Sequence, residues 1–188
     1  MRIFGIDPGS LRTGYGCVET DGSRYRLVTC GVVSAPRGAS FPDRLLAIHE
    51  GLEALLKAAA PECVVIENLF HAKNARSALV LGHARGVAVL AAVRAGLPMF
   101  EYTPAEVKMA VVGYGRAEKH QVQNMVKLLL GLDAVPAPHD AADALAIALC
   151  HGHAGPGAAE RQAARRLPKQ MKSWRDYRPD AAPRRQAP

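Results

Sequence analysis

The order of the short apolar segments constrains the fold of this chain more than any other feature of its sequence. Three strand-like segments come first, joined by short links that contain glycine, which favours an antiparallel meander; they span 1–7, 12–19 and 25–34. Helices and strands then alternate: a helix capped by Ser40, a strand at 62–67, a helix at 74–95, a strand at 99–103, and helices beginning at Pro104, Lys119 and His139. The last helix is expected to run through Ala148. The order predicts an α/β fold, a five-stranded mixed sheet with helices on both faces.

Composition excludes several classes of protein. A chain of 188 residues can bury a full core without a disulfide or metal. Its 49% hydrophobic residues and mean hydropathy of -0.02 exclude a wholly disordered protein. The longest small or apolar run, 86–93, is shorter than the ~20 residues of a membrane span. The sequence shows neither a signal-peptide pattern nor a Cys-x-x-Cys motif, so we expect a cytoplasmic protein with buried, reduced cysteines.

The positive charge lies at the end of the chain. Residues 151–188 hold nine of the 24 Lys and Arg residues but only three of the 17 Asp and Glu residues, so the rest of the chain is nearly neutral. The end of the chain is rich in Arg, Ala, Pro and Gly and has no sustained apolar period. We therefore expect a folded domain at 1–153 and a basic, disordered tail at 154–188. Such a tail either adds salt-sensitive phosphate contacts or keeps the protein soluble.

Four carboxylates have apolar neighbours, which is costly unless they cap a helix, pair with a base or hold a metal. Asp7 and Glu67 each end a strand-like segment, and Asp140 and Asp143 lie one turn apart at the start of the last helix. Asp140 taken alone fits an ordinary helix cap, and Asp7 fits a turn with the Pro-Gly that follows it. Glu67 has no such structural role. Together the four predict a site for Mg²⁺, or Mn²⁺ in its place.

A pair of such cations favours phosphodiester hydrolysis, because one cation can activate water while the other stabilises the leaving oxygen. The phosphate would also need basic partners. One candidate is Lys119, which follows a Gly-Tyr-Gly-Arg loop that ends in Arg116, and another is Lys108 on the preceding helix. A basic group after Glu67 supplies three more: Lys73, Arg76 and Arg85. For each of these residues taken singly, a solvated surface charge is the default interpretation.

Four segments of the chain resemble the RuvC family of crossover junction endonucleases: GIDPGSLRTGYG, VIENLFHAKNARSALVLGHARGV, VKMAVVGYGRAEKHQVQNMV and HDAADALAIALCH. The resemblance covers nearly all of residues 1–153, in order. It implies a ribonuclease H-like fold, a homodimer and Mg²⁺-dependent cleavage of Holliday junctions with two ions per active site. It also implies symmetric cuts that leave ligatable 5′-phosphate nicks, in recombination and DNA repair, together with a branch-migration helicase complex.

The resemblance also implies roles for particular residues. Asp7, Glu67, Asp140 and Asp143 match the metal-binding catalytic acids of the family. Lys108 and Lys119 match basic positions that support DNA binding and catalysis, and Phe70 matches an aromatic residue that contacts unpaired or stacked bases; a core aromatic is the alternative for Phe70. His139 is a further candidate ligand, because some relatives use a histidine in this cluster.

Two other functions are compatible with parts of the sequence. Asp7-Pro8-Gly9 followed by Gly14 loosely resembles the first phosphate loop of actin-like and sugar-kinase-like proteins, but 188 residues are too few for the two domains of that class. A junction-binding protein without catalysis is the second, and the presence of all four acids argues against it. Finally, Ala78, Gly82 and Gly86 form a small-residue stripe that would either pack against the sheet, which the sequence alone favours, or join two subunits.

Overall fold

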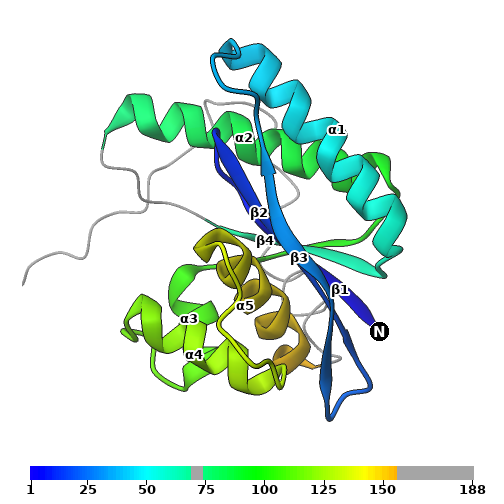
Figure 1. The fold of residues 1–188 in the computed structure, drawn as a ribbon, viewed down its shortest axis with the longest axis vertical. Helices are drawn as coiled ribbons and strands as arrows, with labels where there is room; N and C mark the ends of the chain where they lie inside the picture. The colour runs from blue at the N-terminus through cyan, green and yellow to red at the C-terminus, as the bar shows by residue number, and fades with distance from the viewer. Residues whose placement is uncertain (69–73, 156–188) are drawn as a thin grey trace, which may run out of the picture.

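A computed structural model describes residues 1–68 and 74–155, and its centre is one twisted sheet of five strands in the order β3-β2-β1-β4-β5 (Figure 1). The first three strands form the predicted antiparallel meander, and the last two run parallel to β1. The strands are β1 (Arg2–Asp7), β2 (Arg12–Thr20), β3 (Tyr25–Ser34), β4 (Cys63–Glu67) and β5 (Met99–Tyr102). The predicted mixed five-stranded sheet is therefore confirmed.

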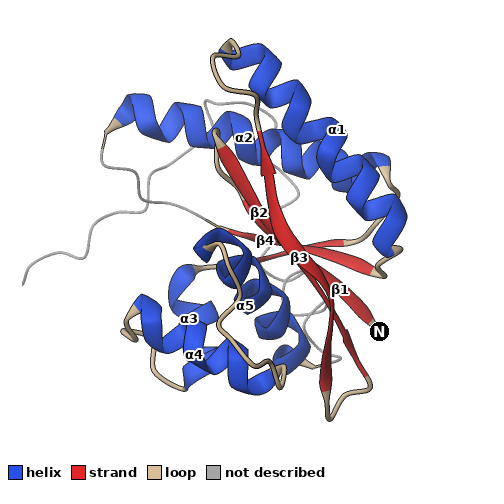
Figure 2. Cartoon of the chain, in the orientation of Figure 1, coloured by secondary structure: helices blue, strands red, loops and turns tan. Residues whose placement is uncertain are grey.

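Helices cover both faces of the sheet, as predicted (Figure 2). One face carries α1 (Phe41–Ala59) and α2 (Ala75–Arg94), which pack against each other. The other face carries α3 (Pro104–Val112), α4 (Lys119–Leu129) and α5 (His139–Ala154), and α5 lies directly on β1 and β2. Because side chains alternate along each strand, the strands contribute side chains to two separate hydrophobic cores, one under each helical layer.

The prediction that the last helix ends at Ala148 was wrong, since α5 continues to Ala154. Tertiary contacts explain the extra turns. The side chain of His151 is buried, its Nδ1 lies 2.9 Å from the hydroxyl of Tyr102, and its ring packs on Phe100. Burial lowers the pKa of His151 to about 4, so the imidazole is neutral at physiological pH. His151 is thus a core residue of the domain.

The small-residue stripe of α2 does not pack against the sheet, so that interpretation was wrong. Its members Ala78, Gly82 and Gly86 are exposed, and a Cβ added to either glycine would meet no described atom within 4 Å. A different set of small residues packs in the core: Ala84, Ala88, Ala91 and Ala92. By length and composition, α2 is the one helix of the described residues that could cross a membrane, but this buried alanine face makes it a covering helix of the sheet.

Candidate active site

Two of the predicted carboxylates extend from neighbouring parallel strands. In the β1–β4 pairing Ile6 lies opposite Ile66, so Asp7 and Glu67 come at the next step of both strands, at the same end of the sheet. Ile6 and Ile66 pack in the core under α1 and α2. Because consecutive side chains point to opposite faces, Asp7 and Glu67 both face the side that α5 covers.

Close packing of α5 on glycines brings the other two carboxylates to the same place. Gly14 lies opposite Asp7 in the β1–β2 pairing, and a Cβ at Gly14 would lie 2.1 Å from the backbone oxygen of Asp140. A Cβ at Gly5 would lie equally close to the backbone oxygen of Ala144. Any larger residue at these two strand positions would therefore push the first turns of α5 away from the sheet.

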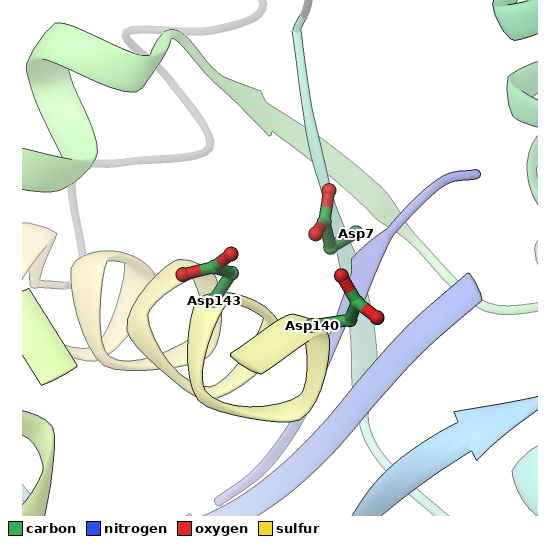
Figure 3. A group of neighbouring side chains, drawn as sticks. All are labelled: Asp7, Asp140 and Asp143. Atoms are coloured by element: carbon green, nitrogen blue, oxygen red, sulfur yellow. The ribbon is translucent and has the colours of Figure 1, made fainter. Parts of the chain in front are cut away.

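As a result, three carboxylates that are distant in sequence meet at one point. One oxygen each of Asp7, Asp140 and Asp143 lie within 4.8 Å of one another, and Figure 3 shows Asp7 on its strand facing the two aspartates near the start of α5. Glu67 lies outside this group of three but lines the adjoining cleft with Asp7 and Asp143. The cleft has a volume of about 200 Å³, and its lining includes Lys108 and Lys119.

Two basic side chains are paired with the aspartates of α5. The Lys119 ammonium lies 2.6 Å from Asp143, and this hydrogen bond raises the pKa of Lys119. On the other aspartate, Nε of Arg12 lies 3.5 Å from Asp140. Lys119 is thus an exposed side chain, as expected of a surface charge, but its ammonium group is paired with an acid of the cluster.

The electrostatics of the cluster favour a bound cation. Burial, and then the charges of Glu67, Asp143 and Asp140, raise the pKa of Asp7 to about 7. Burial and the charge of Asp143 also raise the pKa of Glu67. The carboxylates thus repel one another more than the nearby lysine compensates. A hard divalent cation with oxygen ligands would relieve that repulsion, so this set of donors fits Mg²⁺ or Mn²⁺.

The remaining predicted residues lie outside the cleft or outside the described structure. His139 is exposed at the first position of α5 and is not a member of the close carboxylate group. Arg76 and Arg116 are exposed, and neither lines the cleft. Arg85 is occupied by an ion pair to Glu101 at 2.5 Å. Phe70, Lys73 and the tail at 156–188 lie outside the described residues, so predictions on them stay predictions.

The sequence analysis did not identify Arg12 or the two glycines. Glycine is disfavoured inside strands, so Gly5 and Gly14 could have been recognised as points where another backbone comes close. Arg12 gives a weaker signal, namely a basic residue five positions after a strand-end carboxylate. Its partner Asp140 is known only once α5 is placed on the sheet.

Comparison with known proteins agrees with this geometry. A family model described as crossover junction endodeoxyribonuclease RuvC matches residues 3–151. The chain belongs to the RuvC family. A RuvC of Chloroflexus aggregans is 51% identical over 156 residues, which are 83% of this chain and 95% of that protein. A RuvC of Trichlorobacter lovleyi is 50% identical over 186 residues, 95% of this chain and 100% of the relative.

Solved structures of RuvC proteins share the fold. A structure described as Thermus thermophilus RuvC in complex with Holliday junction substrate matches with a TM-score of 0.75 and 35% identity, over 81% of this chain and 94% of the other. The yeast mitochondrial Holliday junction resolvase Ydc2 matches over 80% of this chain and 77% of its own, with a TM-score of 0.58 and 16% identity, which shows a common fold. The ribonuclease H-like fold predicted for the RuvC family is thus confirmed.

Proposed function

We propose that this chain is a crossover junction endonuclease that resolves Holliday junctions by divalent-metal-dependent hydrolysis of phosphodiester bonds. The observation that carries the proposal is the convergence of carboxylates from β1, β4 and α5 beside a cleft with two lysines. The RuvC match over residues 3–151 supports it further and favours it over an actin-like phosphate binder.

Asp7, Glu67, Asp140 and Asp143 would hold two Mg²⁺ ions, with Mn²⁺ as a substitute and His139 as an additional candidate ligand. Bound divalent ions of this kind activate water and stabilise the charge that develops on the phosphate and the leaving oxygen. The chain's own contribution is to keep the carboxylates in place at the ends of two strands and on the first two turns of a packed helix. It also partly buries the side chain of Asp7.

Two lysines would position the cleaved phosphate. Lys119 is held against Asp143, at the edge of the cleft where a DNA strand would meet the carboxylates. Lys108 reaches the same cleft from α3. Both ammonium groups would balance phosphate charge, and Lys119 would share its donors between Asp143 and the DNA.

Four further residues are proposed as contacts with the junction DNA. Arg76 at the start of α2 and Arg116 before α4 are exposed, so they are available to phosphates of the junction arms. Phe70 would stack on an unpaired base at the junction centre, and Lys73 would bind a neighbouring phosphate.

A homodimer would present two identical sites to a four-way junction. On α2, the side chains of Leu79, Leu90 and Val93 are 64%, 50% and 62% exposed, and they line up with Gly82 and Gly86 at the spacing of a helix seam. Exposed apolar residues beside a small-residue stripe suit a second copy of the helix related by two-fold symmetry. Two such sites would cut symmetrically and leave nicks with 5′-phosphates that a ligase can seal.

Two further features complete the proposal. The family resemblance favours cooperation with a branch-migration helicase complex, and the lack of a signal-peptide or Cys-x-x-Cys pattern favours a cytoplasmic location. They suit a recombination and repair enzyme that acts on chromosomal DNA.

The proposal is tested with a synthetic four-way junction and a linear duplex of the same sequence, each incubated with and without Mg²⁺. We expect symmetric nicks in the junction alone, only with the divalent ion, and sealed afterwards by ligase. Junction binding without any cutting in Mg²⁺ or Mn²⁺ would instead favour the non-catalytic binding protein. Equal cutting of the duplex would contradict selectivity for junctions, and tight nucleotide binding would favour the actin-like class.

A further inference from the structure

Arg12 is a basic side chain beside the carboxylate cluster, on the opposite side from Lys119. Its guanidinium lies 3.5 Å from Asp140, and about half of its side-chain surface is exposed. Within residues 1–68 and 74–155, Arg12 forms one ion pair, with Asp140. A guanidinium has five N–H donors, and one carboxylate cannot use all of them. The side chain therefore keeps donors that can bind a ligand in solution.

The backbone that carries Arg12 is fixed on both sides. The Thr13 hydroxyl donates to the backbone oxygen of Gly9 at 2.9 Å and accepts from its amide at 3.3 Å. The amide of Ala35 donates to the oxygen of Leu11, and Arg12 pairs with Ser34 in the sheet. Only the side chain of Arg12 is thus free to move, so its charge stays at the edge of the carboxylate cluster.

Arg12 and the two lysines lie on opposite sides of the carboxylates. The sheet order places β2, which begins with Arg12, on one side of β1, and β4 and β5 on the other. The cleft with Lys108 and Lys119 is lined by Glu67 of β4, whereas neither Arg12 nor Asp140 lines it. A DNA strand that crosses the carboxylates along this end of the sheet would meet the lysines on one side and Arg12 on the other.

We propose that Arg12 binds a backbone phosphate of the cleaved strand, next to the phosphate that is cut. This inference rests on the proposed function of the site and adds a positioning contact to it. An arginine suits this place because its planar fork can donate two parallel hydrogen bonds to a phosphate while Nε stays near Asp140. The Arg12–Asp140 ion pair is partly exposed and therefore weak, so it does not prevent that contact.

The test compares the full-length wild type with Arg12→Gln, Arg12→Lys and a matched control, Arg24→Gln. Arg24 is an exposed arginine at the far end of the same hairpin. Binding to a synthetic four-way junction is measured without divalent ions, so that no strand is cut, between about 50 and 200 mM KCl. Loss of one phosphate contact lowers the slope of log affinity against log salt by about 0.9 for each subunit that binds.

We therefore expect Arg12→Gln to bind the junction more weakly than the wild type. The ratio of wild-type to variant affinity should fall about 3.5-fold per subunit as the salt concentration rises fourfold. Arg12→Lys should keep the wild-type slope, as should Arg24→Gln. In a second measurement, single phosphates beside the cut site are replaced by neutral methylphosphonates. One of these replacements should weaken the wild type but not Arg12→Gln, because the two changes remove the same contact.

A wild-type salt slope for Arg12→Gln, or equal losses from every methylphosphonate in both proteins, would overturn the inference and leave Arg12 as a partner of Asp140 alone. These results are distinct from a failure of the proposed function. That failure would appear as a wild-type protein that does not cut the junction in Mg²⁺, whatever residue occupies position 12.

Discussion

Replacing Asp7 by asparagine tests whether burial and the neighbouring carboxylates raise the pKa of Asp7 in the folded chain. The pKa of Asp7 rises from its ordinary value of 3.8 to about 7, first through burial and then through its acidic neighbours. A pKa that is raised by folding stabilises the fold at acid pH, and this stabilisation is lost as the pH rises through the folded pKa. Asparagine is isosteric with aspartate and cannot ionise, so the free energy of unfolding of the variant does not fall with pH through this residue.

The size of the effect follows from the two pKa values. At full ionisation the difference corresponds to a ceiling of about 4 kcal/mol. Between about pH 5 and pH 8, the free energy of unfolding of Asp7→Asn relative to wild type should grow by up to about 2.5 kcal/mol. Urea unfolding in EDTA measures it at each pH, with Asp133→Asn, in an exposed loop, as the matched control.

Mg²⁺ provides the second half of the same experiment. A ligand that binds only the folded chain at 100 times its dissociation constant stabilises the fold by about 2.7 kcal/mol. Mg²⁺ should therefore stabilise the wild type, more at pH 8 than at pH 6, because the proton on Asp7 competes with the ion. Asp7→Asn should gain little. A stability difference that stays constant across the pH range, with equal stabilisation of both proteins by Mg²⁺, would refute the reasoning.

Three other changes test the packing of α5 on the sheet, a buried hydrogen bond and the proposed dimer. Gly5→Ala places a methyl group against the backbone oxygen of Ala144, so urea unfolding should show a loss of about 1–3 kcal/mol, and junction cutting should fall with it. Tyr102→Phe leaves the buried Nδ1 of His151 without its hydroxyl partner and should cost about 1–3 kcal/mol in the same assay; an unchanged midpoint would mean that this hydrogen bond contributes nothing net. Leu90→Glu changes a half-exposed side chain, so the fold should persist while sedimentation shifts from dimer to monomer; a dimer that survives would place the interface elsewhere.

Much of the site could be predicted because it depends on local patterns. Asp7 and Glu67 are recognisable as carboxylates that end apolar strands, and side-chain alternation explains why both face α5. Asp140 and Asp143 share a helix face through their spacing alone. What joins the two pairs is the close approach of α5 to β1 and β2, which Gly5 and Gly14 permit.

Other features depend on tertiary contacts that no local pattern reports. Helix α2 carries two faces of small residues, and periodicity cannot decide which one packs on the sheet; the alanine face does, and the stripe with Gly82 and Gly86 remains exposed. The last turn of α5 is held by the contacts of His151 with β5, which lies far away in sequence. The contact between Arg12 and Asp140 likewise forms only after α5 is in place.

The most direct test of the central claim is a crystal structure of the chain grown or soaked with Mn²⁺, whose anomalous scattering locates the ions independently of the protein model. We expect anomalous peaks among the carboxylates of Asp7, Glu67, Asp140 and Asp143, and their loss in Asp7→Asn. Peaks at other residues, or none at this cluster under conditions in which the protein cuts junction DNA, would contradict it.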